Sequence, residues 1–388
     1  MKLLRIIRSL DPVGGGPAEG IRQITSHLTA LGIYTTVVSL DPPDSPWLHD
    51  QAFHSKGLGP VLGSYGYRRN LPDCIRSIAQ NHDCVIIEGL WQYHAFATWR
   101  ALRSTGIPYF VYPHGMLDPW FKHTYPLKHV KKWCYWPWAD YRVLRDASAV
   151  LFTTEQERLL AKQSFFLYRA NEEVVGFGTS IPPSEAVLQR AAFLNRFPHL
   201  SNKRLLLFLS RIHPKKGIDL LLEAFSGVAS SDSALHLVIA GPDQVGLQGD
   251  LICRANALGI ADRITWPGML CGDLKWGAFR CAELFCLPSY QENFGIVVSE
   301  ALACGLPVSI SESVNIAPDV ASACAGIVHP PSVEGAKVAL QQWLQMSCAS
   351  RVQMSRNAVE LFDSTFNFAS VATNLVSVLK SEPKQLCE

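Results

Sequence analysis

The stretch LFCLPSYQENFGIVVSEALACGLPVSI, residues 284–310, contains one complete strand–helix–strand unit. Residues 284–288 form an apolar run, a polar loop follows, and an apolar helical pattern begins near Gly295. Gly305 and Pro307 end that pattern beside a second apolar run over residues 307–310. Two buried strands joined by a helix are typical of a parallel sheet with helices on both faces. The stretch therefore predicts a doubly wound α/β fold.

The same alternation of strand-like and helical patterns extends through the rest of the chain. Further strand-like runs occupy residues 2–9, 34–40, 84–87, 109–112, 149–153, 204–209, 235–240 and 263–266. Residues 172–203 interrupt the series with Gly-Phe-Gly, two prolines and a polar run. We therefore expect an N-terminal domain over residues 1–180, a second over 181–365, and a C-terminal helix over 366–388 that packs back toward the first. Two Rossmann-like domains facing across a cleft would bind a ligand at the carboxyl ends of their strands.

Composition excludes several classes of protein. The chain has 388 residues, of which 48% are hydrophobic, with a formal net charge of +2. This composition excludes intrinsic disorder and gives no global attraction to nucleic acid. No run reaches the roughly 18 apolar residues of a membrane helix, and the N-terminus lacks the apolar core of a signal peptide. An odd count of 11 cysteines without a C-x-x-C pair indicates a reducing compartment. A cytoplasmic protein is expected.

Charged side chains suited to a phosphorylated ligand gather around the helix of the opening stretch. Glu292 and Glu300 bracket its first turns, and free backbone N–H groups at a helix N-terminus bind anions such as phosphate. Glu300 could accept hydrogen bonds from ribose hydroxyls. After the strand over residues 204–209 comes a basic loop that contains Arg211 and Lys216, and two fixed cations of this kind can bind an anionic group.

The spacing of these groups resembles the E-x7-E motif of the retaining glycosyltransferases of the GT-B fold, family 4 (group 1). Ser210-Arg-Ile-His-Pro-Lys-Lys-Gly217, Ala240-Gly-Pro242 and Trp266-Pro-Gly-Met269 resemble further motifs of this family, in the same order. The resemblance implies that Arg211 and Lys216 grip the donor diphosphate. It implies that Glu292 contacts the hydroxyls of the donor sugar without acting as a nucleophile. The donor-binding residues expected are Gly15, Gly16, Gly241, Met269, Asn293, Phe294, Gly295, Ile296 and Glu300.

The first domain offers two motifs of its own. Gly14, Gly15 and Gly16 lie at a strand-to-helix turn, where a backbone without side chains can approach an anion. His114 follows the strand over residues 109–112, at the carboxyl end of the expected sheet. The family resemblance implies that this histidine lies near the transferring sugar, so the expected catalytic residues are His114, Arg211, Lys216 and Glu292.

The sequence contains no D-x-D triplet, the metal-binding motif of the other major glycosyltransferase fold (GT-A). Basic side chains and helix N-termini would then stabilise the diphosphate. We expect no catalytic metal and no cofactor, with a nucleoside diphosphate sugar as the donor substrate.

Residues 118–145 combine basic and aromatic side chains. The stretch holds six lysines and arginines against only Asp118 and Asp140, and four of the ten tryptophans lie between residues 120 and 138. Interleaved aromatic and basic side chains suit a membrane interface. A second interpretation is a helix pair with a solvated basic face and an aromatic core. If the stretch binds a membrane, the acceptor would be a lipid-linked sugar at the cytoplasmic leaflet.

The sequence therefore predicts a retaining enzyme that moves a hexose from a UDP- or GDP-sugar to a hydroxyl of a glycan or lipid-linked glycan, in surface polysaccharide biosynthesis. One alternative is an NAD-dependent oxidoreductase that uses the loop from Gly14 to Gly20, with Asp41 as the ribose-binding acid. Its spacing, G-x-G-x-x-x-G, differs from that of the dinucleotide fingerprint. A non-catalytic nucleotide-sugar-binding protein and an epimerase or phosphorylase of the same fold are also compatible with the motifs.

Overall fold

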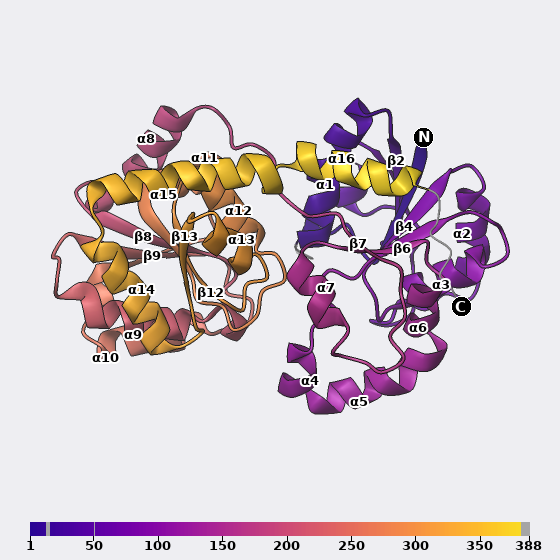
Figure 1. Cartoon of the computed structure of the whole chain (residues 1–388), viewed down its shortest axis with the longest axis horizontal. Helices are drawn as coiled ribbons and strands as arrows, with labels where there is room; N and C mark the ends of the chain where they lie inside the picture. Colours follow the sequence, from indigo (N-terminus) through magenta and orange to yellow (C-terminus); the bar gives the residue numbers. More distant parts are fainter. Residues whose placement is uncertain (13–15, 50, 382–388) are drawn as a thin grey trace. The chain divides into compact units, whose positions relative to one another are not determined.

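The computed structural model describes residues 1–12, 16–49 and 51–381. It divides the chain into two compact units (Figure 1). Unit 1 contains Met1–Ser180 together with Phe368–Glu388, and unit 2 contains Ile181–Asn367. The chain thus leaves unit 1 after Ser180 and returns to it at Phe368.

Unit 1 is built on a seven-stranded parallel sheet with the strand order β3-β2-β1-β4-β5-β6-β7. The first strands lie side by side outward from β1, and the later strands continue on its other side. The order therefore reverses between β1 and β4, which is the topological switch point of a doubly wound sheet. The strands are β1 (Lys2–Ile7), β2 (Tyr34–Ser39), β3 (His54–Gly57), β4 (Cys84–Glu88), β5 (Tyr109–Tyr112), β6 (Ala149–Phe152) and β7 (Glu172–Val174).

Helices cover both faces of this sheet because its central strands are apolar on both sides. Leu4 and Ile6 belong to one hydrophobic cluster, and the alternation of side chains along β1 places Leu3 in another. The second cluster includes α1 and α16, so the C-terminal helix belongs to the core of unit 1 (Figure 1). The helices are α1 (Gly16–Ala30), α2 (Leu71–Ala79), α3 (Tyr93–Leu102), α4 (Trp120–Thr124), α5 (Pro126–Tyr135), α6 (Asp140–Arg145), α7 (Glu155–Ala161) and α16 (Phe368–Lys380), with 3-10 turns η2 (Pro46–Leu48) and η3 (Trp136–Trp138).

Unit 2 repeats this topology with six parallel strands in the order β10-β9-β8-β11-β12-β13. Its switch point lies between β8 and β11. The strands are β8 (Arg204–Leu209), β9 (Leu235–Ala240), β10 (Ile264–Gly268), β11 (Ala282–Leu287), β12 (Val308–Ser311) and β13 (Gly326–His329).

The connections of unit 2 carry its helices and short turns. The helices are α8 (Ala186–Arg196), α9 (Ile218–Ala229), α10 (Gln248–Ala257), α11 (Gly272–Cys281), α12 (Ile296–Ala303), α13 (Ala317–Ser322), α14 (Val333–Gln345) and α15 (Cys348–Leu361). The turns are η4 (Pro198–Leu200), η5 (Pro214–Lys216), η6 (Ala261–Arg263) and the π-helical turn η7 (Phe362–Phe366). The loops after β8 and β11 position the candidate site.

Three strands were not anticipated, and each is a strand at a sheet edge. β3 and β7 have the sequences HSKG and EEV, in which polar residues interrupt any apolar run. β13 is the outermost strand of the second sheet. Edge strands are half covered, so their hydrophobic signal is weak.

Within the part of the chain that the structure describes, no helix is both long and apolar enough to cross a bilayer. The ten cysteines in that part are all free thiols.

Candidate functional site

The site of unit 2 begins where β8 and β11 end side by side. The loop after β8 contains η5 and Gly217, and the loop after β11 passes directly over it. The backbone of Gly217 has a φ of 67°, and a Cβ there would lie 2.1 Å from the carbonyl oxygen of Pro288. The amide of Tyr290 donates to the carbonyl oxygen of Lys215 at 2.8 Å. Only glycine allows this approach, which brings two loops that are distant in sequence into contact at the switch point.

Lys216 and Glu292 meet across these two loops. The Lys216 ammonium forms an ion pair with the Glu292 carboxylate. Their side chains are only 10% and 18% exposed, so the pair is shielded from much of the solvent. The backbone of Glu292 is fixed as well, because its amide donates to Ser313 at 3.0 Å and its carbonyl accepts from Asn315 at 3.1 Å. The structure therefore joins two of the predicted catalytic residues in one charged pair.

The helix α12 begins directly after this pair. Gly295 has a φ of 75° and forms the N-cap, so the N–H groups of Ile296 and Val297 precede the first bond of the helix, which Val298 makes to the Gly295 carbonyl at 2.8 Å. Phe294 is buried and packs edge-on against Phe366, with ring centroids 5.5 Å apart. Its side chain anchors the loop, while the Asn293 side chain accepts from Asn315 at 3.2 Å. The turn thus presents backbone N–H groups rather than side chains.

Glu300 lies on the second turn of α12 and is held by a lysine from α11. The Lys275 ammonium lies 2.6 Å from Oε1 of Glu300, whose side chain is 4% exposed. The same ammonium lies 4.9 Å from the ring centroid of Trp276. Lys275 was not anticipated from the sequence.

The remaining predicted residues of unit 2 have separate surroundings. Gly241, with a φ of 146°, allows the backbone after β9 to pass over Ser210, whose carbonyl oxygen would lie 1.8 Å from an added Cβ. Arg211 is exposed and donates to Oε1 of Gln244 at 3.3 Å. Met269, after β10, is 68% exposed. The structure therefore pairs Lys216 with Glu292 but pairs Arg211 with a neutral amide.

In unit 1, His114 lies just beyond the end of β5 and is bonded to an acid at the end of β4. Its Nε2 lies 2.7 Å from Oε2 of Glu88, and Arg5 of β1 lies 2.7 Å from the other carboxylate oxygen. The Glu88 side chain is fully buried. Burial alone would raise the pKa of Glu88, but the charge of Arg5 and the bond to His114 outweigh it and hold that pKa below its ordinary value.

The glycine-rich turn of unit 1 is only partly described. Gly14 and Gly15 lie outside the described residues, and Gly16 is the first residue of α1. A Cβ on Gly20 would lie 2.3 Å from Cζ of Phe177, so close packing accounts for this glycine. Asp41 is buried and accepts from the Ser9 hydroxyl at 2.6 Å and the Leu10 amide at 2.9 Å. The acid that the NAD alternative requires therefore has both oxygens engaged in the β1–α1 loop.

Comparison with known proteins identifies the family. A model described as "Glycosyl transferases group 1" matches residues 190–361, and a "Glycosyl transferase 4-like domain" model matches residues 15–178. The chain belongs to the group 1 glycosyltransferase family. The resemblance to group 1 glycosyltransferases inferred from the sequence motifs is thereby confirmed. The two parallel α/β units, together with the solved structures described below, confirm the GT-B fold class.

The family member is similar to curated glycosyltransferases over part of their length. It is 33% identical to the D-inositol 3-phosphate glycosyltransferase of Mycolicibacterium smegmatis over 177 residues, which are 44% of this chain and 38% of that protein. It is 41% identical to the Salinispora tropica protein of the same name over 108 residues, 26% of this chain and 22% of that one. The aligned region thus spans well under half of either relative.

Solved structures share the fold over nearly the whole chain. Anabaena HepE in complex with UDP-glucose has a TM-score of 0.76 at 18% identity, covering 98% of this chain and 100% of the other. Sucrose-phosphate synthase from Thermosynechococcus elongatus has a TM-score of 0.75 at 17% identity, covering 97% of each chain. At these identities the likeness concerns the fold alone.

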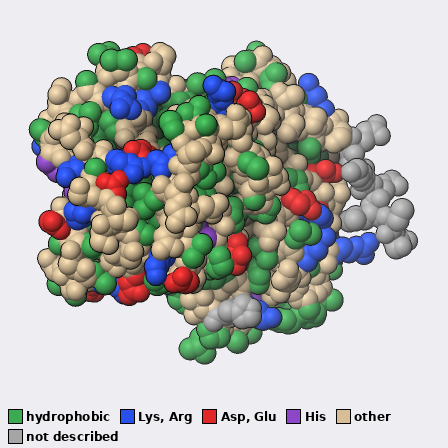
Figure 2. All heavy atoms as spheres, turned by 60° about the vertical axis from the view of Figure 1, so that its left-hand side comes forward, with side chains coloured by type: hydrophobic (Ala, Val, Ile, Leu, Met, Phe, Trp, Pro, Cys, Tyr) green, Lys and Arg blue, Asp and Glu red, His purple; other side chains and the backbone are tan. Residues whose placement is uncertain are grey.

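The basic and aromatic stretch of this group 1 protein divides between core and surface. Trp136 is fully buried and stacks on Phe165 at 4.5 Å. Leu127 and Val130 of α5 are 86% and 60% exposed. Figure 2 shows hydrophobic side chains gathered at the lower edge of the molecule, where α4 and α5 lie. Trp136 therefore belongs to the core, Trp133 and Tyr141 pack against it half-buried, and the exposed apolar surface of α5 is mainly aliphatic.

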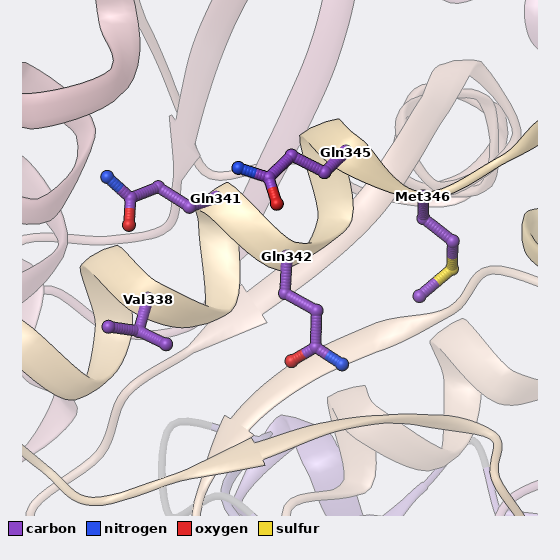
Figure 3. Close-up of a pocket in the computed structure, with 5 residues that line it drawn as sticks. All are labelled: Val338, Gln341, Gln342, Gln345 and Met346. Carbon is purple, nitrogen blue, oxygen red and sulfur yellow. The ribbon is translucent and has the colours of Figure 1, made fainter.

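A shallow hollow beside α14 lies apart from all predicted residues. It has a volume of about 360 Å³ and is lined by Val338, Gln341, Gln342, Gln345 and Met346 (Figure 3). None of these five side chains is charged, so the hollow offers no cation to a phosphate. No three His, Cys, Asp or Glu side chains of the described ranges are grouped so that they could hold a metal ion.

Sequence reasoning missed the partners of the predicted residues. Glu88 carried a usable signal, since a carboxylate ending an otherwise apolar strand is unusual and requires a buried partner. Lys275 carried none, because it lies 25 residues before Glu300 in an ordinary helical pattern.

Proposed function

We propose that the protein is a retaining glycosyltransferase that moves a hexose from a nucleoside diphosphate sugar to a hydroxyl of a glycan or lipid-linked glycan. The observation that carries the proposal is the partly buried pair of Lys216 and Glu292 at the switch point of unit 2. Lys216 supplies a fixed cation for a departing diphosphate, and Glu292 supplies an acceptor for sugar hydroxyls. Because these two side chains are in contact, the group that would bind the diphosphate and the group that would bind the sugar lie side by side.

The remaining donor contacts follow from the same edge of the sheet. The N–H groups at the start of α12, near Gly295 and Ile296, complement a phosphate. Glu300 accepts hydrogen bonds from the ribose hydroxyls, while Lys275 donates to one of its carboxylate oxygens. Arg211, exposed and bonded to the neutral Gln244, is able to turn toward the diphosphate.

UDP-glucose is the donor to test first. HepE, which shares this fold, was solved with UDP-glucose, and this supports a uridine donor over a guanosine donor. Glucose is proposed as the transferred sugar because of the same structural similarity to HepE. Sugar specificity then depends on the surroundings of Glu292.

Retention is proposed from the motif resemblance, and the state of Glu292 argues against a covalent intermediate on that residue. A retaining glycosidase uses one carboxylate as nucleophile and a second as acid. Here Glu292 is bonded to Lys216 and Glu300 to Lys275, so each carboxylate faces a cation rather than the other acid. We propose front-face attack with the diphosphate accepting the proton, and NMR of the product's anomeric proton distinguishes retention from inversion.

The acceptor is proposed to be lipid-linked, at the cytoplasmic face of a membrane where surface polysaccharide is assembled. Leu127 and Val130 are exposed on α5 beside the exposed Lys128 and Lys131. Apolar side chains flanked by lysines bind anionic bilayers. The affinity for vesicles of one-third phosphatidylglycerol, measured by sedimentation, should fall at least tenfold in a Leu127→Ser, Val130→Ser double variant. The control is Val338→Ser, on an exposed helix of unit 2, which should bind the vesicles as the wild type does.

The first experiment is thermal unfolding with UDP, GDP, ADP or NAD at about 1 mM, with and without EDTA. A ligand at 100 times its Kd stabilises by about 2.7 kcal/mol. We expect a shift with UDP that EDTA does not reduce. A shift with NAD alone would overturn the proposal. A shift with UDP but no hydrolysis or transfer of UDP-glucose, with any acceptor tried, would instead favour a non-catalytic nucleotide-sugar-binding protein.

A further inference from the structure

Three buried side chains of unit 1 form one hydrogen-bonded network: Arg5 of β1, Glu88 of β4 and His114. Arg5 of β1 donates through Nε and Nη2 to Oε1 of Glu88, each at 2.7 Å. The other carboxylate oxygen, Oε2, faces Nε2 of His114 at 2.7 Å. Arg5 is 3% exposed, the Glu88 side chain is fully buried, and that of His114 is 8% exposed. This network of three side chains therefore lies almost entirely out of solvent.

For a neutral His114, the donor and acceptor chemistry of these three side chains permits one arrangement of protons. A guanidinium has only donors, and an ionised carboxylate has only acceptors. Because Arg5 and His114 together outweigh the effect of burial, the pKa of Glu88 lies below its ordinary value and the group is ionised. Nε2 of a histidine facing that carboxylate must then carry the proton. In the neutral ring Nδ1 is left as an acceptor.

The ring plane is fixed by its neighbours. Tyr112 stacks on His114 with ring centroids 5.3 Å apart and an interplanar angle of 16°. The edge of Phe177 lies 6.1 Å away at 82°. The backbone is held too, because the Gly115 amide donates to Oε1 of the buried Glu157 at 2.5 Å. His114 itself has a φ of 50°, an uncommon conformation that these contacts maintain.

Nδ1 of His114 makes no hydrogen bond to any residue that the structure describes. An imidazole whose ring plane, backbone and one nitrogen are all fixed has a single remaining polar atom to offer. This is the arrangement by which a carboxylate sets the tautomer of a functional histidine.

We infer that Glu88, backed by Arg5, is a positioning residue that holds His114 as the Nε2–H tautomer, so that Nδ1 accepts a hydrogen bond from a hydroxyl of a bound sugar. The assignment of that hydroxyl rests on the proposed function. The tautomer itself does not, since it follows from the contacts within unit 1. Glu88 thus determines whether this position of the site accepts or donates.

The substitution Glu88→Gln tests the inference with little change in shape. The amide must turn its oxygen toward Arg5, which has only donors, and so presents its NH2 group to Nε2. Nε2 then becomes the acceptor, and the proton moves to Nδ1. The 15N chemical shifts of histidine-labelled protein distinguish a protonated from a bare ring nitrogen. We expect Nε2–H in the wild type and Nδ1–H in the variant.

An internal control is present in the same spectra. Nε2 of His94 lies 2.9 Å from the backbone carbonyl oxygen of Glu88, which the substitution leaves unchanged. His94 should therefore keep its Nε2–H tautomer in both proteins. A change at His94 as well would mean that the strand has rearranged, and Glu88→Asp, which keeps a carboxylate, then serves as the second variant, with Nε2–H expected at His114. Loss of that tautomer in Glu88→Asp while the shorter carboxylate remains ionised would overturn the inference.

Binding measurements separate the tautomer from its use. Calorimetric titration with UDP and with UDP-glucose should show an unchanged Kd for UDP and about a tenfold weaker Kd for UDP-glucose in Glu88→Gln. A switched tautomer with equal loss for both ligands, or with none, would overturn the role of Nδ1. If the wild-type protein binds neither nucleotide, the proposed function fails and the assignment of the sugar hydroxyl fails with it, whereas the NMR result still decides the tautomer.

Discussion

The switch points of units 1 and 2 have the same strand order and opposite electrostatic designs. In unit 1, a carboxylate at the end of β4 is fully buried between an arginine and a histidine. In unit 2, the loops after the corresponding strands hold Lys216 and Glu292, whose partly exposed charges bind each other. In the first arrangement both carboxylate oxygens are bonded within the protein. In the second, we expect a diphosphate to compete with Glu292 for the Lys216 ammonium.

This difference teaches which part of the site must change when a ligand binds. Charges that are buried and satisfied stay in place, because separating them leaves an unpaired ion in a medium of low polarity. The Lys216–Glu292 pair keeps some exposure, so a ligand anion that reaches the ammonium can replace the carboxylate and make up for the lost charge pair. We therefore expect unit 1 to be preorganised, and the Lys216–Glu292 pair of unit 2 to open when a donor binds.

Removing the cation of unit 2 should have the largest effect. Lys216→Ala removes a fixed charge from the departing diphosphate, and we expect kcat/KM for UDP-glucose to fall about 10³-fold, about 4 kcal/mol of transition-state stabilisation. The matched control is Lys203→Ala, an exposed lysine just before β8, at the opposite end of that strand. Equal activity of the two variants would contradict the role of Lys216.

Removing the acid should separate binding from turnover. Glu292→Gln removes the partner of Lys216 without a change in size, so UDP no longer competes with a carboxylate. We expect the affinity for UDP to rise a few-fold while the turnover of UDP-glucose falls about 10²-fold, measured by calorimetry and by release of UDP. Weaker UDP binding would show that the pair does not open, and Glu334→Gln, 75% exposed on α14, is the control.

Replacing Gly241, which lets the backbone after β9 pass over Ser210, should cause a large loss of stability. In Gly241→Ala the added Cβ would meet the carbonyl oxygen of Ser210 at a φ of 146°, so backbone must move. We expect a loss of about 3 kcal/mol in the free energy of unfolding, measured by urea titration. Gly249→Ala, in the helix α10 with open space around it, should instead gain about 0.5–1 kcal/mol. Similar results for both would mean that the close approach costs nothing.

A second buried acid of unit 1 tests whether burial or pairing sets the ionisation there. Burial raises the pKa of Asp140 to about 7, although the Trp91 amide donates to it and Lys132 lowers it. The folded protein then keeps a proton, between about pH 4 and 7, that the unfolded chain releases, so this group makes stability fall as pH rises through that window.

Asp140→Asn cannot release that proton. Between pH 4.5 and 7.5 the variant should lose about 3 kcal/mol less of its free energy of unfolding than the wild type, measured by urea titration followed by tryptophan fluorescence. The lysine nearby acts outside this range, because burial lowers the pKa of Lys132 to about 8. Parallel pH profiles for the two proteins would show that Asp140 is ionised throughout, as Glu88 is.

The sequence by itself determined the elements and the residue types of the site. The runs over residues 109–112, 204–209 and 235–240 became β5, β8 and β9 without a shift, because an apolar run bounded by turns reports burial locally. β3 and β7 escaped notice because polar edge strands bury too little to leave such a run. The glycines at 217, 241 and 295 and the acids at 292 and 300 were visible as a motif.

Only the tertiary structure decided which charges meet. Lys216 and Glu292 lie 76 residues apart, and Glu88 and His114 lie 26 apart. The order of strands in each sheet brings the members of each pair together. No local sequence pattern encodes that order, because the neighbour of each strand depends on how the whole sheet assembles. The sequence named Lys216, Glu292 and His114, and the order of the strands decided that Lys216 would pair with Glu292 and that His114 would face the buried Glu88.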